Sequence, residues 1–179
     1  MITKANYYYT KSELKYLLDS IVVLADTREK KNNHILNYFE QQGIEYKSRK
    51  LDFGDYSFML AANKELGISR DIYFSSSISI ERKASLNELS NNLTQKRTQF
   101  ENELIRANNA KIILLVEDQQ GYKNILQHNY RTQYKPKSFI SSLATFQARY
   151  NLDIRFLSKE LSGNFIYYSL RYWAREYLK

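Results

Sequence analysis

Two uninterrupted apolar runs constrain the fold of this chain more than any other feature. The run SIVVLA covers residues 20–25 and the run KIILLVE covers residues 111–117, so each has the length of a single strand. A strand that is apolar on both faces has to be covered on both faces, as the central strands of an α/β sheet are. Segments with helical periodicity separate the predicted strands. We therefore expect an α/β domain with a central mixed β-sheet flanked by helices.

The other elements follow from periodicity, because one proline and five glycines give the chain little punctuation. Thr10 and Glu13 form a capping-box pattern, which predicts a short helix over residues 10–18. Further helices are predicted over residues 33–42, 85–104, 139–150 and 166–177. Further strands are predicted over residues 44–51, 56–60, 72–83 and 153–157, with a polar loop over residues 61–71.

Length and composition indicate the class of protein. A chain of 179 residues is large enough for one domain with a real core, and no apolar run approaches the roughly 20 residues that span a bilayer. We expect an N-terminal helical extension over residues 1–19 and a single domain over residues 20–179. The chain has no cysteine and its first residues lack the apolar core of a signal peptide, so we expect a cytoplasmic, intracellular protein.

The charge balance indicates a polyanionic partner. The net charge is +8 at pH 7, and the isoelectric point is about 9.4. Such a balance favours nucleic acid first and an anionic membrane surface second. The segment QHNYRTQYKPK, residues 127–137, combines cations with tyrosines and is predicted to be a loop that contacts a nucleic-acid strand.

The segment ISIERK, residues 78–83, combines charged residues at the end of a predicted strand. Side chains alternate along a strand, so Glu81 and Lys83 share one face and Arg82 points to the other. A carboxylate can bind a divalent cation that lowers the pKa of an attacking water, and a nearby lysine can stabilise charge on a phosphate. One carboxylate rarely holds Mg²⁺ well, and Asp55 in the GDY turn is the predicted second ligand. Taken alone, these residues are explained more simply by a turn and a surface ion pair.

A second polar cluster, Asp26-Thr27-Arg28-Glu29, directly follows the first apolar run. Ligand-binding groups collect at the carboxyl ends of strands in α/β sheets, which makes this cluster a candidate for the same site. Asp26 and Glu29 would also suit the start of the next helix, where the helix dipole favours negative charge. Arg28 does not suit a helix start unless an anion lies nearby.

Taken together, the motifs D-T-R-E, G-D-Y and I-E-R-K, in this order and at these separations, resemble those of a known family. This is the XPF-type (ERCC4-domain) family of structure-selective endonucleases, in the PD-(D/E)xK nuclease superfamily. The resemblance extends from about Ile21 to Asp118. It implies a PD-(D/E)xK, restriction-endonuclease-like fold for a nuclease domain over residues 20–179. It also implies Mg²⁺- or Mn²⁺-dependent hydrolysis of phosphodiester bonds in branched, flapped or junction-containing DNA, by a chain that could act as a homodimer.

The resemblance implies a role for each residue of the predicted metal site. Asp55 and Glu81 would be the principal metal ligands, and Asp26 would be a third carboxylate close to the metal. Lys83 would be the catalytic lysine.

Other residues would shape the active site or contact the substrate. Arg28 and Glu29 would shape the site, and Arg28 could meet a phosphate. Arg82 would contact the backbone or the DNA, and Lys96 and Arg97 would reach the DNA strand being cut. For Lys96 and Arg97, a solvated helix face is an equally good explanation.

The chain departs from the family pattern in two places. The pattern often continues as E-R-K-x-x-x-D, but Asn87 occupies the fourth position after Lys83, with Glu88 next. A register shift or the loss of an ancillary carboxylate would explain this change. Many relatives carry tandem helix-hairpin-helix domains with closely paired glycines, which are missing here, so we expect no such module. The single histidines, His34 and His128, are expected at the surface and not as metal ligands.

Two alternative functions remain open. A non-catalytic DNA-binding or scaffold subunit could have the same fold, although it would not need the set Asp26, Asp55, Glu81 and Lys83. A junction-resolving or restriction-type nuclease of the same superfamily would need this set. DNA substrates of different structure would separate that enzyme from a flap or fork endonuclease.

Overall fold

The computed structural model describes residues 9–107 and 110–179 of the chain. Its strands are β1 (Ile21–Ala25), β2 (Tyr46–Ser48), β3 (Tyr56–Leu60), β4 (Ile72–Tyr73), β5 (Ile78–Lys83), β6 (Lys111–Glu117) and β7 (Leu152–Leu157). Its α-helices are α1 (Lys11–Asp19), α2 (Asn33–Gln41), α3 (Leu86–Leu93), α4 (Arg97–Arg106), α5 (Gly121–Leu126), α6 (Pro136–Tyr150) and α7 (Ser162–Leu178). Two short 3-10 helices are η1 (Lys64–Leu66) and η2 (Lys159–Leu161).

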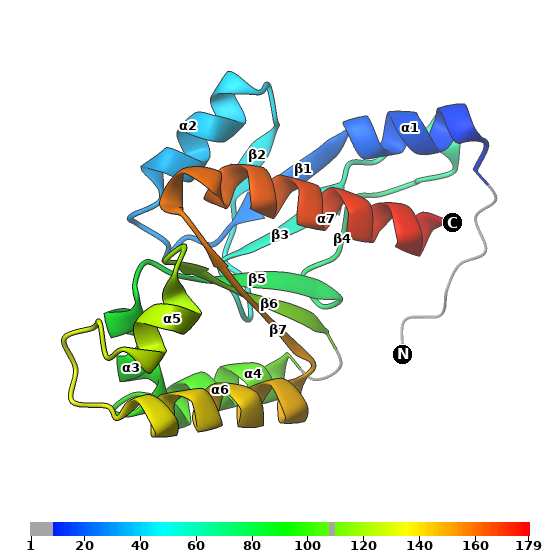
Figure 1. Cartoon of the computed structure of the whole chain (residues 1–179). Helices are drawn as coiled ribbons and strands as arrows, with labels where there is room; N and C mark the ends of the chain where they lie inside the picture. The colour runs from blue at the N-terminus through cyan, green and yellow to red at the C-terminus, as the bar shows by residue number, and fades with distance from the viewer. Residues whose placement is uncertain (1–8, 108–109) are drawn as a thin grey trace.

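A mixed seven-stranded sheet crosses the molecule in the order β2-β1-β3-β5-β6-β7, with β4 paired to β3 (Figure 1). β1 and β2 are parallel, β3 is antiparallel to both β1 and β5, and β5, β6 and β7 are parallel. The carboxyl ends of β1, β5 and β6 therefore meet the amino end of β3 at one end of the sheet. The predicted α/β class with a central mixed sheet is confirmed.

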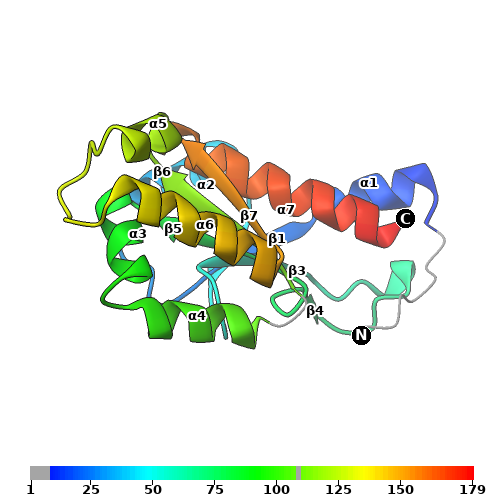
Figure 2. The ribbon, with the colours of Figure 1, turned by 60° about the horizontal axis from the view of Figure 1, so that its bottom comes forward.

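Helices cover both faces of this sheet, as the doubly apolar strands require. α1, α2 and α7 pack on one face, and α3, α4, α5 and α6 pack on the other (Figure 1). In β6, Ile113 and Leu115 belong to the first core, whereas Ile112 and Leu114 belong to the second. Figure 2 shows α1 and α7 side by side on the first face. The two cores explain why the run over β6 is uninterrupted, whereas Val22 and Leu24 on the second face of β1 pack with Leu51 and Met59 in a separate small cluster.

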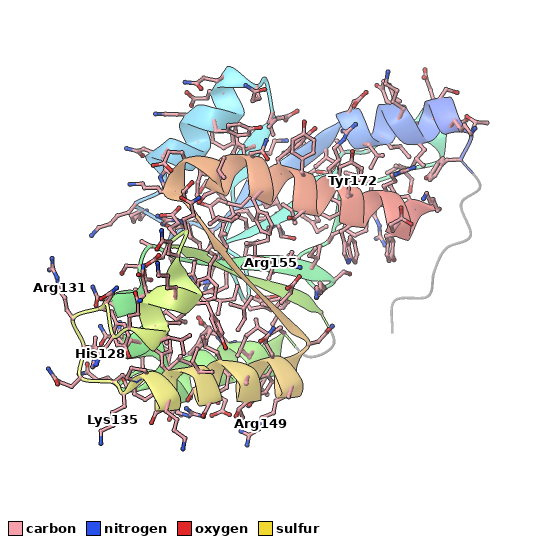
Figure 3. All side chains as sticks on the ribbon, viewed as in Figure 1. His128, Arg131, Lys135, Arg149, Arg155 and Tyr172 are labelled. Atoms are coloured by element: carbon pink, nitrogen blue, oxygen red, sulfur yellow. The ribbon has the colours of Figure 1, made fainter. Side chains whose placement is uncertain are left out.

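The edge strand β7 is less buried than the central strands. Its exposed Arg155 (Figure 3) forms an ion pair with Asp153 at 2.9 Å. Charged side chains on an edge strand discourage pairing with another chain, which is how native sheets protect their edges.

Two predicted elements are each divided in the structure. The predicted strand over residues 72–83 is β4 and β5, because the chain turns between them and the Ser77 N–H donates to the Phe74 carbonyl at 2.8 Å. The predicted helix over residues 85–104 is α3 and α4, because the Thr94 hydroxyl donates to the Ser90 carbonyl at 2.8 Å where α3 ends. At Thr94 a short polar side chain thus competes for a backbone hydrogen bond and helps to interrupt the helix.

Two smaller differences concern the length of elements. β2 is shorter than predicted and covers only Tyr46–Ser48 of residues 44–51. Helix α5 was not predicted, because its 6 residues are too few to show a helical period.

The predicted capping box at the start of α1 is confirmed. Thr10 Oγ1 accepts from the Glu13 N–H at 3.3 Å, and Glu13 Oε2 accepts from the Thr10 N–H at 2.7 Å. Leu17 and Leu18 are buried in the same core as α7. The division of the chain between residues 19 and 20 stays a prediction, and residues 1–8 of the predicted extension lie outside the described residues. Within residues 9–107 and 110–179, no helix is long and apolar enough to cross a membrane.

Gly54 lies where the turn before β3 packs against β5. Its φ is +70°, and a Cβ at this position would lie 2.0 Å from the Ser79 hydroxyl oxygen. That hydroxyl is itself held 3.1 Å from the carbonyls of Phe53 and Tyr56. The turn that carries Asp55 therefore requires glycine for both its conformation and its close approach to β5.

We expect Gly54→Ala to lower the free energy of unfolding by about 2–4 kcal/mol, because backbone strain adds to a steric clash. Gly43→Ala is the matched control, with a φ of +64° and no neighbouring atom within 4 Å of a Cβ. Gly43→Ala should lower the free energy of unfolding by only roughly 1–2 kcal/mol, the cost of a left-handed backbone conformation. Urea unfolding of the two variants measures the difference, and equal losses would contradict this account of the turn.

Candidate active site

The three sequence motifs meet at one end of the sheet. The Asp26 N–H donates to the Asp55 carbonyl at 2.7 Å, and the Asp55 N–H donates to the Ile80 carbonyl at 2.8 Å. These two bonds place the turn before β3 between the end of β1 and the end of β5. Residues that are far apart in the sequence are thus held together by backbone hydrogen bonds, which fix their positions independently of the side chains.

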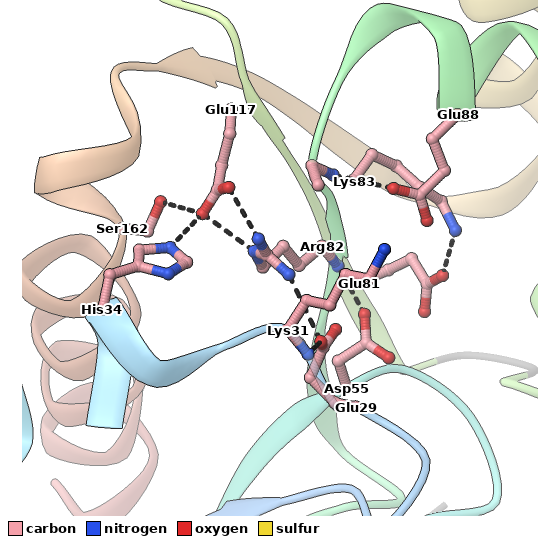
Figure 4. A network of polar contacts seen from close by, with 11 residues as sticks. Glu29, Lys31, His34, Asp55, Glu81, Arg82, Lys83, Glu88, Glu117 and Ser162 are labelled. Carbon is pink, nitrogen blue, oxygen red and sulfur yellow. Dashed lines mark hydrogen bonds and ion pairs between the residues drawn. The ribbon is translucent and has the colours of Figure 1, made fainter. Parts of the chain in front are cut away.

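A hollow of about 310 Å³ lies at this end of the sheet. Glu88, from the first turn of α3, also lines it. The predicted site residues that line this hollow are Arg28, Glu29, Asp55, Glu81, Arg82 and Lys83. We call it the acidic pocket. Figure 4 shows its carboxylates, Glu29, Asp55, Glu81 and Glu88, on separate segments of the chain.

Asp55 is the most perturbed acid of the acidic pocket. Its Oδ2 accepts from the Arg82 N–H at 2.7 Å, and no hydrogen bond from the described part of the chain reaches its Oδ1. Burial, together with the charge of Glu81, raises the pKa of the Asp55 carboxyl well above its ordinary value. A buried carboxylate with an open oxygen and a like charge nearby is stabilised by a bound cation.

Glu81 and Lys83 lie on one face of β5, as the strand alternation predicted. Lys83 Nζ lies 2.5 Å from Glu81 Oε1 and 5.1 Å from the centre of the Phe100 ring on α4. Burial alone would lower the pKa of the Lys83 ammonium, but the charge and hydrogen bond of Glu81 outweigh it and raise the pKa. Lys83 is therefore positively charged and fixed in position inside the pocket.

Two further carboxylates were not predicted for this site. Glu103 on α4 is close enough that burial and the charge of Glu81 raise its pKa. Glu88 lines the acidic pocket, whereas the amide oxygen of Asn87 accepts from the Arg131 N–H at 2.7 Å. Glu88 is the residue after Asn87, which occupies the position where the family pattern often has aspartate. A shift of that pattern by one residue was therefore the signal that could have indicated Glu88. Glu103 belongs to no motif, and only the position of α4 brings it to the site.

The side chains of the acidic pocket suit a hard cation. Among the residues that the structure describes, no group of three or more His, Asp or Glu side chains is arranged to hold a metal ion. Asp55 and Glu81 nevertheless border the same hollow. Mg²⁺ typically keeps several waters and binds through one or two carboxylates, so this pair fits Mg²⁺ or Mn²⁺ and not zinc, which prefers nitrogen and sulfur ligands.

Asp26 lies beside the pocket and does not line it. Its Oδ1 accepts from the Arg28 backbone N–H at 2.8 Å and from Arg28 Nε at 2.7 Å, and its Oδ2 accepts from the Leu51 N–H at 2.6 Å. Burial alone would raise the pKa of Asp26, but these hydrogen bonds lower it. Asp26 therefore holds the segment after β1 against Leu51. Its role as a third metal ligand stays a prediction that no contact in the structure supports.

Arg82 points to the opposite face of β5 and is only 5% exposed. Its guanidinium binds both oxygens of Glu117, at 2.8 and 2.7 Å, and lies 3.3 Å from Glu29. Glu117 Oε1 also accepts from His34 Nε2 at 2.6 Å and from the Ser162 hydroxyl at 2.8 Å (Figure 4). We call this set the Arg82 network. Because Arg82 is fully engaged here, its contact with DNA stays a prediction that its burial does not favour.

The Arg82 network contains residues whose importance the sequence did not indicate. Glu117 ends β6, which runs parallel to β5, so its place beside the end of β5 could have been inferred from the second apolar run. His34 was expected at the surface, but its side chain is only 20% exposed and contacts Glu117.

The two predicted DNA-binding residues of the following helix lie at the break between α3 and α4. Lys96 is exposed. Arg97 donates to the Ser142 hydroxyl at 3.0 Å and lies 4.9 Å from the centre of the Phe146 ring, so it packs α4 against α6. Neither residue lines the acidic pocket.

A second hollow, of about 550 Å³, lies between α1 and α7. Its charged lining residues are all cations, namely Lys11, Lys15, Arg171, Arg175 and Lys179. Among the residues that the structure describes, no carboxylate lines this hollow, so they offer it no carboxylate oxygens of the kind that divalent cations prefer. The acidic pocket is therefore the candidate active site.

Comparisons with known proteins agree with this fold. The ERCC4 domain model matches residues 25–169. XPF from Aeropyrum pernix is similar in structure, with a TM-score of 0.60 and 20% identity over 84% of this chain and 60% of that chain. XPF from Aeropyrum pernix in complex with DNA has a TM-score of 0.60 and 18% identity over 87% of this chain and 65% of that chain. The chain thus spans less than two thirds of either structure. No curated protein matches the chain in sequence.

The mixed sheet, with carboxylates and a lysine at one end, defines a PD-(D/E)xK-type α/β fold. The matched family model covers most of the chain, and the chain belongs to the ERCC4 domain family. The family resemblance seen in the sequence is confirmed, with XPF structures as neighbours in fold. Membership of this family supports a role in cleaving or binding DNA.

We expect Glu117→Gln to lower the free energy of unfolding at pH 7 by about 3–5 kcal/mol, because it leaves Arg82 buried without its main partner. Burial alone would raise the pKa of Glu117, but hydrogen bonds from Arg82, His34 and Ser162 hold it below its ordinary value of 4.5. A lowered pKa stabilises the fold above the unfolded-state value, and this contribution is lost as the pH falls through the folded-state value.

The difference between wild type and Glu117→Gln should therefore be complete at pH 7 and should shrink below about pH 4.5. Urea unfolding at several pH values measures it. Glu45→Gln removes an exposed carboxylate whose ion pair with Lys47 spans 3.6 Å, and this control should change stability by less than about 1 kcal/mol. A loss at Glu117 no larger than that at Glu45 would show that the Arg82 network does not support the fold.

Proposed function

We propose that the chain is a Mg²⁺- or Mn²⁺-dependent endonuclease that hydrolyses phosphodiester bonds in DNA, with branched or flapped duplexes as its substrates. One observation carries this proposal: Asp55, Glu81 and a charged Lys83 share one hollow at the end of the sheet. Two carboxylates with a lysine are the groups that metal-assisted hydrolysis of a phosphodiester needs.

The residues of the acidic pocket have separate roles in this proposal. Asp55 and Glu81 would hold the cation, which when bound supplies a water of lowered pKa and neutralises charge on the phosphate. Lys83 is kept charged by Glu81 and would stabilise the negative charge that develops on the phosphate. Arg28, 55% exposed at its side chain, lies at the same pocket and can meet a neighbouring phosphate.

The charge of the whole molecule supports DNA as the substrate. The chain carries a net charge of +8, and Lys30 and Lys31 line the acidic pocket beside its carboxylates. Cations at the border of an acidic pocket can bring the phosphate backbone close to a metal that the carboxylates hold. A structure of similar fold is named as a complex with DNA, which supports DNA as the partner. The preference for branched or flapped DNA is part of the proposal and rests on the resemblance of the three sequence motifs.

A non-catalytic DNA-binding or scaffold subunit is the second candidate. The observation that favours it is the contact between Lys83 and Glu81, since the ammonium occupies an oxygen that a cation would use. The open Oδ1 and the raised pKa of Asp55 favour catalysis, because a purely structural role gives no reason to bury a carboxyl group with one oxygen unpaired beside Glu81.

The test is cleavage of labelled flap, fork, four-way junction and linear duplex DNA with Mg²⁺, with Mn²⁺ or with EDTA. We expect cleavage only with metal, and fastest on the flap or the fork. Asp55→Asn, Glu81→Gln and Lys83→Ala should each lower the rate by roughly 10²–10³-fold or more, because each removes charge stabilisation at the reacting phosphate. Glu65→Gln and Lys64→Ala, on the exposed η1, are matched controls that should keep the wild-type rate.

Each contrary result has a distinct meaning. Metal-dependent cleavage that survives Glu81→Gln would contradict the assignment of the acidic pocket. DNA binding without cleavage in any metal would support the scaffold subunit. Cleavage that is fastest on the four-way junction would indicate a junction-resolving enzyme.

A further inference from the structure

We infer that the loop between α5 and α6, residues 127–135, is a preformed surface for the DNA phosphate backbone beside the acidic pocket. Asn87 positions this loop. The inference rests on the proposed function, since it assigns DNA as the partner. It adds a contact surface and a positioning residue that the ERCC4 motifs do not contain.

The first observation is the charge of residues 119–152, which follow Asp118 and lead into β7. Residues 119–152 contain no Asp or Glu, although the whole chain has 19 of them. Their cations are Lys123, Arg131, Lys135, Lys137 and Arg149. Only Arg149 forms an ion pair within the described ranges, with Glu101 at 3.3 Å. The other four are exposed and carry no ion pair with a described carboxylate, so they give the segment a positive charge.

The second observation is that the loop is held in one conformation. The Arg131 N–H donates to Asn87 Oδ1 at 2.7 Å, and the Thr132 hydroxyl lies 2.5 Å from the Ser90 hydroxyl. His128 Nε2 lies 2.9 Å from the Thr132 carbonyl, so the loop is also closed on itself. Side-chain bonds to two successive turns of α3 fix the loop against that helix.

Two tyrosines, Tyr130 and Tyr134, attach the other end of the loop to α6. The Tyr134 hydroxyl lies 2.6 Å from the Ser142 hydroxyl and donates to the Ser138 carbonyl at 3.0 Å. The rings of Tyr130 and Tyr134 pack on Phe139, with ring centres 5.3 and 5.4 Å away. Because most of the conformational entropy of the loop is already lost in the folded protein, binding of a DNA strand would cost little additional ordering.

The third observation is the position of the loop. α3 begins directly after the segment that ends in Lys83, and its Glu88 lines the acidic pocket while the adjacent Asn87 holds the loop. The two surfaces therefore lie on neighbouring sides of one helical turn. Figure 3 shows Arg131 and Lys135 projecting outward from the loop into solvent. A DNA backbone that reaches the acidic pocket would pass these cations.

The side-chain amide of Asn87 suits this arrangement because it is neutral. An aspartate could accept the same hydrogen bond from the Arg131 N–H, but it would place a negative charge beside the cations that face the DNA. The amide fixes the loop and leaves its positive potential intact. Asn87 is thus a positioning residue, because it would act on DNA through Arg131 and not by touching it.

The two residues can be tested separately because the bond between them uses the backbone of Arg131. Arg131→Ala keeps the N–H that Asn87 binds and removes only the guanidinium. Asn87→Ala removes the hydrogen bond and keeps the guanidinium, and Asn87→Asp keeps the bond while adding charge. Arg149→Ala, at the far end of α6, is the matched control because its cation is already paired with Glu101.

Fluorescence anisotropy with a labelled flap in EDTA measures binding without cleavage, at several salt concentrations. We expect Arg131→Ala to raise Kd about 5- to 10-fold near 0.1 M salt and to reduce the slope of log K against log salt by about 1, the loss of one phosphate contact. Asn87→Ala should raise Kd to a similar extent, and the double variant should be no weaker than Arg131→Ala alone. Asn87→Asp should bind more weakly than wild type while keeping its thermal stability.

Cleavage assays provide a second measurement that a purely structural role would not change in the same way. Loop variants should raise KM and leave kcat close to wild type, because they remove substrate binding and not transition-state stabilisation. An unchanged Kd and salt slope for Arg131→Ala would overturn the DNA surface. Additive losses in the double variant would overturn the role of Asn87. If wild type binds DNA in this way but never cleaves it, the proposed nuclease function fails while the loop surface stands.

Discussion

The bidentate ion pair between Arg82 and Glu117 is the interaction on which the site depends most. Arg82 lies between Glu81 and Lys83 on β5, so its guanidinium fixes the strand from one face while its neighbours form the acidic pocket on the other. Its backbone N–H also binds Asp55. One residue thus connects the structural network on one side of the sheet with the predicted chemistry on the other. Displacing Arg82 would move both ligands of the proposed metal at once.

The ionised form of Asp55 is unfavourable in the protein without metal, and a bound cation would stabilise it. This is the physical basis of the proposed metal site. Burial and the charge of Glu81 raise the pKa of Asp55, so a proton and a divalent cation compete for the same oxygens. A raised pKa means that the folded state binds this proton more tightly than the unfolded state does, so stability without metal decreases as the pH rises through the folded-state pKa. Metal affinity increases as the pH rises, because the carboxylate ligand has to be deprotonated to bind the cation.

The sequence contained enough information to predict the class of fold and six of the residues that line the acidic pocket, but not Lys30, Lys31 or Glu88. Apolar runs identify strands buried on both faces, and alternation along ISIERK assigns Glu81 and Arg82 to opposite faces. The side-chain contacts of Asp26 and Glu103 were not predictable. Asp26 is saturated by Arg28 and Leu51, and burial together with the charge of Glu81 raises the pKa of Glu103 because of where α4 lies after the break at Thr94. The sequence carries no periodic signal for such pairings, which depend on where helices end.

The central claim is that Asp55 and Glu81 together hold a divalent cation. The most direct measurement is anomalous diffraction from crystals of the protein soaked in Mn²⁺, compared with crystals of Glu81→Gln soaked in the same way. The account predicts one strong peak in the acidic pocket of wild type, in direct contact with Asp55 Oδ1 and a carboxylate oxygen of Glu81, and a weakened or missing peak in the variant. No peak in the pocket at saturating Mn²⁺, or an undiminished peak in Glu81→Gln, would contradict it.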